Sequence, residues 1–221
     1  MYRFYTHSRL TPGSLAELDV EELHHLRKVL RVRNGERIEL VNGKGQLATA
    51  IYADLITIQS VHSEPKSDRK SVLIQALPEK THLEFILEKG TEIGITEFWF
   101  FPSERSKIDV ISDALLLRMK KITISAIKQC KRLHLPSIYA HHHITDFKEH
   151  SFKLYLADPK GTTFHHTDEL SKGIIVGPES GFTQKEIDYF QTTCKAIPTT
   201  LSPNILRAET AAIVASYLIC S

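Results

Sequence analysis

Residues 177–182, Gly-Pro-Glu-Ser-Gly-Phe, follow directly on the apolar run 173–176, which is typical of a buried β-strand. Thr183 and Glu186 come next with the spacing of a capping box, so a helix is expected to begin immediately after the loop. The arrangement is therefore a strand, a tight loop and a helix. In sheets with helices on both faces, ligands bind beyond the carboxyl ends of the strands. Residues 177–182 are therefore expected where such a fold binds its ligand.

Three familiar motifs do not fit this loop. A Walker phosphate loop requires GxxxxGK followed by Ser or Thr, and Gly177 has no such partner. The dinucleotide fingerprint GxGxxG fails because position 179 is Glu. A GxSxG hydrolase elbow places the serine two residues after the first glycine, whereas Ser180 is three residues after Gly177. A cofactor loop and a plain tight turn remain as alternatives.

Downstream of residue 70, short apolar segments alternate with helical patterns. The expected strands are 72–77, 97–101, 137–140, 153–157, 173–176 and 195–199, and the expected helices are 83–93, 112–133, 183–193 and 207–220. Because the strands are apolar along nearly their whole length, both of their faces must be covered. The alternation predicts the α/β class, with a parallel sheet between layers of helices.

The first sixty residues predict a small β-barrel with one short helix. Strands are expected at 3–5, 37–41, 46–52 and 55–61, and the helix over 20–30. Asp19 and Glu22 have capping-box spacing at the start of that helix. Asn42-Gly43 predicts a type I′ hairpin turn. The polar stretch 63–70 separates two domains, which we place at 1–66 and 71–221.

Charge is balanced over the whole chain but not along it. The chain has 221 residues and a formal net charge of +2, from 28 Lys and Arg against 26 Asp and Glu. Residues 102–135, however, hold eight Lys or Arg against three Asp or Glu. This local excess favours a polyanionic partner, and a solvated helix face is the alternative.

Other compositional features exclude several classes of protein. The three cysteines are widely spaced and form no CxxC pair, which fits a reducing cytosol and predicts a cytoplasmic protein. The chain shows no signal-peptide pattern and no apolar run of the ~18 residues that a membrane span needs. The histidine runs 141–143 and 165–166 are poor chelates, because adjacent residues of a strand point to opposite faces. We therefore expect no membrane and no metal.

A second stretch, residues 201–212, repeats the arrangement of the first loop. It reads Leu-Ser-Pro-Asn-Ile-Leu-Arg-Ala-Glu-Thr-Ala-Ala and lies between an expected strand and an expected helix. Arg207 and Glu209 are charged residues at the start of an otherwise apolar helix. Taken alone, they are either functional or a local ion pair at a solvated helix end.

Together the two loops resemble the cofactor loops of the bacterial 16S ribosomal RNA uracil-N3 methyltransferases, a family of the SPOUT class. That family carries G-P-E-G-G-F/L and L-G-x-x-I/V-L-R-x-E-T-A, which stand here as residues 177–182 and 201–211. Shorter resemblances follow in the same order along the chain: His25-Leu26 with 29–31, 88–94, 103–106, and 129–132 with Pro136. Each is weak alone, but their order makes the resemblance specific and extends it over the whole chain.

The resemblance implies a fold and an activity. It implies a PUA-like RNA-binding β-barrel at 1–66, followed at 71–221 by a SPOUT domain whose parallel sheet carries a C-terminal trefoil knot. It implies a homodimer that uses S-adenosylmethionine to methylate uridine N3 in the decoding region of 16S rRNA in the 30S subunit. Two alternatives remain, a non-catalytic RNA-binding relative and a SPOUT enzyme with another target such as ribose 2′-O.

The resemblance also assigns residues. The expected cofactor contacts are Val176, Gly177, Pro178, Glu179, Gly181, Leu201, Ser202, Asn204, Ile205, Leu206, Thr210 and Ala211. Arg207 is expected to stabilise the uridine anion, and Glu179 and Glu209 are the candidate bases or orienting groups. The expected RNA contacts are Arg27, Arg31, Arg105, Gln129 and Arg132, with Arg27 and Arg31 on one helical face.

Two serines depart from the family pattern. Ser180 and Ser202 stand where the family has glycine. If those positions have positive φ, serine costs roughly 1–2 kcal/mol of backbone strain. The hydroxymethyl groups would also crowd the cofactor.

Overall fold

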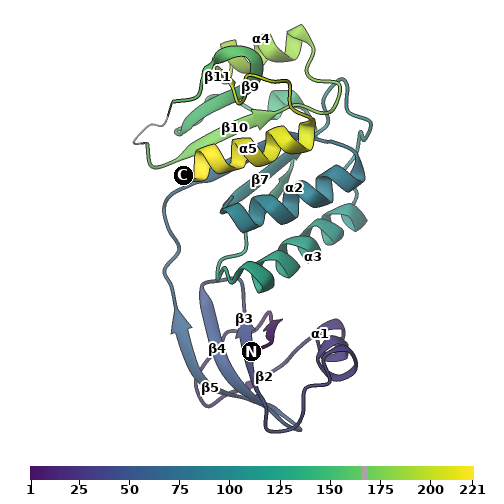
Figure 1. Cartoon of the computed structure of the whole chain (residues 1–221), viewed down its shortest axis with the longest axis vertical. Helices are drawn as coiled ribbons and strands as arrows, with labels where there is room; N and C mark the ends of the chain where they lie inside the picture. Colours follow the sequence, from purple (N-terminus) through teal and green to yellow (C-terminus); the bar gives the residue numbers. More distant parts are fainter. Residues whose placement is uncertain (166–168) are drawn as a thin grey trace. The chain divides into compact units, whose positions relative to one another are not determined.

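The computed structural model describes residues 1–165 and 169–221, so His166 of the second histidine run lies outside the described residues (Figure 1). The chain forms two units. The first comprises Met1–Ser67 together with Ile124–Leu135, and the second comprises Asp68–Thr123 and Pro136–Ser221. The segment Ile124–Leu135 therefore belongs with the first unit, although it lies outside the range 1–66.

The first unit is built on a curled five-stranded sheet (Figure 1). Its strands follow the order β1 (Arg3–Tyr5), β3 (Arg37–Val41), β4 (Gln46–Tyr52), β5 (Ile56–Ser63) and β2 (Leu15–Ala16). The pair β1–β3 is parallel and the other pairs are antiparallel. The register shifts between Thr49 and Ala50, and such a bulge bends a strand. The core of this unit contains the fully buried side chains of Phe4, Ile38 and Ile58.

The loop between β3 and β4 differs from the expected two-residue turn. Residues 42–45 form it, and its positive φ values lie at Gly43 (67°) and Gly45 (88°). The side chain of Asn42 accepts the backbone N–H groups of Lys44, at 2.9 Å, and Gln46, at 3.2 Å. The type I′ prediction is wrong because the Asn42 side chain takes up these amides, which lengthens the turn by two residues.

The helix of the first unit ends one residue earlier than expected and changes from α to π geometry. Asp19 caps α1 (Val20–His24) by accepting the Glu22 backbone N–H, and a π-helical segment, η1 (His25–Val29), follows. Arg31 lies beyond η1 with a φ of 51°. The prediction that Arg27 and Arg31 share one helical face is therefore wrong, because the helix ends before it reaches Arg31.

Residues 124–135 join the first unit through both packing and hydrogen bonds. Ile127 and Leu133 share a small core with Tyr5 and Val41. Glu22 does not complete the expected capping box. Its carboxylate instead accepts the Tyr5 backbone N–H and pairs with Lys128.

The second unit contains a six-stranded sheet in which every pairing is parallel, as the sequence predicted. The strand order is β11 (Ile197–Thr200), β9 (Lys153–Thr163), β10 (Lys172–Val176), β6 (Ser71–Ala76), β7 (Glu97–Phe101) and β8 (Ser137–Ala140). The strand that precedes the first loop, β10, is thus an inner strand between β6 and β9. Its carboxyl end is surrounded by other parts of the sheet.

Helices cover both faces of this sheet, which confirms the α/β class. On one face, α2 (Lys80–Ile93), the first part of α3 (Asp113–Cys130) and α5 (Ala208–Cys220) pack on a core that contains Leu73. On the other face, α4 (Gln184–Thr192) packs on a core that contains Val72 and Ile74. Figure 1 shows α2 and α5 side by side over one face of the sheet. A 3₁₀ turn, η2 (Ile144–Asp146), follows β8.

Within the described residues, no helix combines the length and the apolar character needed to cross a bilayer. The trefoil knot and the homodimer stay predictions.

Candidate functional site

A cavity of about 410 Å³ lies at the carboxyl ends of β10 and β11, beside the middle of β9. Its walls come from 156–159 of β9, from 176–182 and from 200–206, with side walls from Arg105, Ile187, Ala208 and Ala211. All of these residues belong to the second unit. The volume is within the range of about 300–1,000 Å³ that is usual for small-ligand sites.

The structure brings the two loops of the sequence analysis together at this cavity. Eleven of the twelve expected cofactor contacts line it. Thr210 does not, because it is exposed on α5 while its neighbour Ala211 faces the cavity. Sequence patterns missed the wall formed by Asp158 and Pro159. That wall belongs to β9, whose position beside β10 follows only from the order of the strands.

The first loop contains a tight turn that ends at Gly181. The Gly181 backbone N–H donates to the Pro178 carbonyl at 2.9 Å, and Gly181 has a φ of 66°. In the described part of the chain, Arg31, Lys131 and Lys195 are the non-glycine residues with positive φ. The backbone strain considered for Ser180 and Ser202 is therefore absent, and the left-handed conformation falls on the glycine beside Ser180.

Groups on two other segments, β6 and the segment that carries Arg105, hold this loop in place. The buried Gln75 side chain of β6 donates to the Gly177 carbonyl at 3.0 Å. The Arg105 guanidinium donates to the carbonyls of Ser180, at 3.1 Å, and Phe182, at 3.4 Å. Arg105 therefore supports the loop, and its contact with RNA stays a prediction.

The predicted capping box at the start of α4 is present. Thr183 accepts the Glu186 backbone N–H at 3.3 Å, and Glu186 accepts the Thr183 backbone N–H at 2.8 Å. The Glu186 carboxylate also accepts the Glu104 backbone N–H at 2.9 Å. One buried carboxylate therefore joins the helix start to the segment that carries Arg105.

The second loop contains a turn held by the side chain of Ser202, and it leads into α5. The Ser202 hydroxyl accepts the Asn204 backbone N–H at 3.1 Å, so it serves a local turn. Arg207 is the N-cap residue of α5 and is exposed. Its neighbours Leu206 and Ala208 both line the cavity. Arg207 thus stands at the rim, where it can reach a substrate larger than the cavity.

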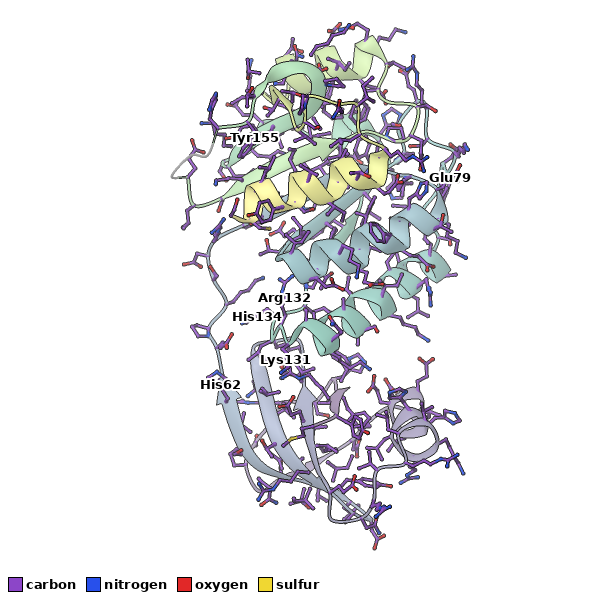
Figure 2. The ribbon with its side chains drawn as sticks, viewed as in Figure 1. His62, Glu79, Lys131, Arg132, His134 and Tyr155 are labelled. Carbon is purple, nitrogen blue, oxygen red and sulfur yellow. The ribbon has the colours of Figure 1, made fainter. Side chains whose placement is uncertain are left out.

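The two predicted carboxylates meet at a histidine that the sequence analysis did not single out. His82 Nδ1 lies 2.7 Å from Glu179 Oε1 and 3.9 Å from Glu209 Oε2. Glu179 Oε1 also accepts the Glu79 backbone N–H at 2.9 Å, at the start of α2. Glu79 is labelled in Figure 2. His82 could not be recognised from its neighbours in sequence, because its partners lie about a hundred or more positions away.

These contacts shift the pKa values of His82 and Glu179. The hydrogen bond to Glu179 raises the pKa of His82 above its usual 6.5, against the effect of desolvation, and the charges of Glu209, Glu179 and Glu79 raise it further. Burial favours a higher pKa for Glu179, but the hydrogen bonds from His82 and from backbone amides outweigh it and lower that pKa. The Oε2 atom of Glu209 is buried and has no hydrogen-bond partner within the described residues.

Comparison with known proteins places this site in a family. Residues 65–220, more than half of the chain, match the family model of the RNA methyltransferase domain. The chain belongs to the RNA methyltransferase family. A second model, the RNA methyltransferase PUA domain, matches residues 18–60 of this methyltransferase.

Named relatives are similar to this methyltransferase over nearly its full length. The ribosomal RNA small subunit methyltransferase E of Buchnera aphidicola is 30% identical, with 96% of this chain and 90% of that protein covered. The protein of the same name from Rickettsia conorii is 28% identical, with 96% and 92% covered.

Solved structures share the fold. A methyltransferase from Legionella pneumophila in complex with S-adenosylmethionine is 28% identical, with a TM-score of 0.86, and 98% of this chain and 96% of that chain are covered. The ribosomal RNA small subunit methyltransferase E of Neisseria gonorrhoeae, bound to S-adenosylmethionine, is also 28% identical. Its TM-score is 0.85, and 98% of this chain and 95% of that chain are covered.

The other predicted RNA contacts of this methyltransferase lie in the first unit. Arg27 and Arg31 fall within the PUA match, and the Arg27 side chain donates to the Tyr52 hydroxyl at 3.1 Å. Gln129 is exposed at the end of α3. Arg132 follows that helix and is labelled in Figure 2 beside Lys131 and His134. These positions suit an RNA contact, which stays a prediction.

Proposed function

We propose that this methyltransferase transfers a methyl group from S-adenosylmethionine to N3 of a uridine in the 16S rRNA of the 30S subunit, as a cytoplasmic homodimer. The observation that carries the proposal is the single cavity formed by residues 176–182 and 200–206. The two loops that resemble the cofactor loops of the uracil-N3 methyltransferases thus form one site. Two proteins with the same fold were crystallised with S-adenosylmethionine, and the named relatives are ribosomal RNA small subunit methyltransferases.

The cavity fits S-adenosylmethionine by size and by lining. Apolar side chains of Leu156, Val176 and Leu206 suit the flat face of an adenine. The tight turn that ends at Gly181 lets backbone groups approach a ligand closely. When bound, S-adenosylmethionine supplies an activated methyl group, so the protein has to position the uridine and manage its charge.

Arg207 is the group that we assign to the uracil. Loss of the N3 proton spreads negative charge over O2 and O4 of the ring, and a guanidinium at the cavity rim stabilises that charge. Arg207 is exposed and lies between two lining residues, which suits contact with a base that enters from outside.

The two carboxylates are suited to different tasks. Glu179 already accepts hydrogen bonds from His82 and from the Glu79 amide, and its pKa is lowered, so it orients the loop. Glu209 keeps one buried oxygen without a hydrogen-bond partner within the described residues. We therefore assign the removal of the N3 proton to Glu209.

The deciding experiment is methyl transfer to 30S subunits that lack the modification. We expect 3-methyluridine in the digested 16S rRNA, detected by mass spectrometry. A 2′-O-methylated nucleoside would favour a different RNA target. RNA binding without calorimetric binding of S-adenosylmethionine would favour a non-catalytic relative. Absence of transfer under every presentation of the RNA would reject the proposal.

Arg207→Ala should lower turnover roughly 100-fold, the usual cost of removing one charge-stabilising donor. The affinity for S-adenosylmethionine should stay within about threefold, since the side chain is at the rim. Single-turnover kinetics and calorimetry separate the two effects. Lys185→Ala, which removes an exposed cation from α4, is the matched control and should change neither quantity. Equal losses of turnover and cofactor affinity in Arg207→Ala would contradict the assigned role.

A further inference from the structure

His82 stands between the two segments that carry the candidate carboxylates. It lies in the first turn of α2, whereas Glu179 belongs to the first loop and Glu209 to the first turn of α5. One ring nitrogen, Nδ1, is 2.7 Å from Glu179 Oε1 and 3.9 Å from Glu209 Oε2. The three side chains are 31%, 26% and 18% exposed, so solvent only partly screens their charges.

We infer that His82 is a positioning residue, which in its protonated form holds Glu179 and Glu209 together and so keeps the cofactor loop and the proposed base in their working arrangement. The inference rests on the proposed function and adds to it a dependence on pH. His82 touches neither the uracil nor the methyl donor in this scheme. It acts through the two carboxylates.

The chemistry of the imidazole explains why its charge matters. A neutral ring with its proton on Nδ1 can still donate to Glu179. It cannot attract Glu209, however, because at 3.9 Å from Oε2 only the charge of the imidazolium acts strongly. When the ring loses its charge, two carboxylates that approach the same atom repel each other. The base then becomes less well positioned, while the loop keeps one hydrogen bond.

Three carboxylates on three segments act on His82. Glu79 lies on the same helix end, Glu179 on the loop, and Glu209 on α5. Glu79 in turn pairs with Lys107. The hydrogen bond to Glu179 and these negative charges raise the pKa of His82 above 6.5. Because the folded-state pKa is raised, the positioning effect is present at lower pH and is lost as the pH rises through that pKa.

Two variants separate charge from packing. His82→Gln keeps a hydrogen-bond donor but has no charge, and His82→Lys carries a positive charge over the whole range from pH 6 to 9. We expect turnover of the wild-type protein to fall roughly three- to fivefold as His82 loses its proton, the size of an exposed charge pair. His82→Gln should show the low value throughout. His82→Lys should remain active, and its turnover should not show this fall as the pH rises.

The readouts must distinguish positioning from general stability and from failure of the proposed function. We would measure turnover and calorimetric S-adenosylmethionine affinity at each pH, and follow the His82 ring by NMR. The ring pKa should lie above 6.5 and move toward 6.5 in Glu179→Gln. His142→Gln, which removes an exposed histidine of the same unit, should behave as the wild type. Melting temperatures check the fold of each variant.

The outcomes are distinct. If His82→Gln matches the wild type at every pH, or if His82→Lys keeps the wild-type pH profile, the inference is overturned. Normal cofactor binding by the wild type without methyl transfer defeats the proposed function. In that case the NMR pKa of the His82 ring still judges the inference: a pKa that moves toward 6.5 in Glu179→Gln supports it, and a pKa that Glu179→Gln leaves unchanged overturns it. A wild type that binds no S-adenosylmethionine overturns both.

Discussion

At the scale of single residues, Ser180 and Gly181 are neighbours with opposite backbone requirements. Ser180 has an ordinary φ, whereas Gly181 has a φ of 66° and would place a Cβ where nothing lies within 4 Å. A side chain at 181 therefore costs backbone strain rather than space. The family resemblance drew attention to Ser180, but the structure shows that Gly181 is the constrained position.

Gly181→Ala should therefore lower the free energy of unfolding by roughly 1–2 kcal/mol and weaken binding of S-adenosylmethionine. Ser180→Gly is the matched change one residue away. It should leave cofactor affinity unchanged and cost at most about 0.5–1 kcal/mol, through greater freedom of the unfolded chain. Urea unfolding and calorimetry measure the two quantities. A large loss of affinity in Ser180→Gly would mean instead that the hydroxyl contacts the ligand.

At the scale of secondary-structure elements, the start of α4 fixes the end of the first loop. Thr183→Ala removes one partner of the capping box and should lower the free energy of unfolding by about 1 kcal/mol. Thr192→Ala provides a control at the other end of the same helix, where Thr192 is exposed and its hydroxyl donates to the Asp188 carbonyl. It should change stability by less than about 0.5 kcal/mol. Similar losses in both variants would show that the cap has no special role.

The same element shows what sequence patterns can predict. The capping box of Thr183 and Glu186 was predictable because its atoms belong to residues three positions apart. The strand β9 was predicted to end at residue 157, but it continues to Thr163 because Thr162 and Thr163 pair with Thr199 and Thr200 of β11. That extension depends on a partner strand, so the local pattern could not indicate it.

The candidate site divides in the same way. Both loops were found from motifs that are continuous in the chain, and eleven of the twelve expected cofactor contacts line the cavity. The wall at Asp158 and the contacts of His82 were not found, because each depends on which strand or helix lies next to the loop. The prediction of a type I′ turn at Asn42 was wrong for a local reason. The Asn42 side chain accepts backbone N–H groups and replaces the backbone hydrogen bond on which the turn rule relies.

At the scale of the whole molecule, the cavity lies within the second unit, whereas four of the five predicted RNA contacts lie in the first. Substitution of Arg31 tests RNA binding by the first unit, because this side chain is exposed and basic. Its φ of 51° means that glycine can replace it without backbone strain. Arg31→Gly should weaken RNA binding and reduce the slope of log affinity against log salt by about 1, as expected for one lost phosphate contact. Arg31→Lys should keep that contact. Filter binding over a range of salt concentrations measures both.

Lys195 supplies the control for this prediction. It is also exposed and basic and has a φ of 57°, but it belongs to the second unit and is not a predicted RNA contact. Lys195→Gly relieves the same kind of strain and should leave RNA affinity unchanged. If both glycine variants lose affinity equally, binding follows total charge rather than a contact at Arg31.

The segment Ile124–Leu135 has a consequence for synthesis of the chain on the ribosome. Ile127 and Leu133 complete a core with Tyr5 and Val41, yet Leu135 comes 68 residues after Ser67. At translation rates of about 5–20 residues per second, roughly 3–14 seconds pass between the synthesis of Ser67 and that of Leu135, so Tyr5 and Val41 wait at least that long for these partners. During that time residues 1–67 have already been made, but the side chains of Tyr5 and Val41 are not yet covered. A chaperone can bind this exposed apolar surface.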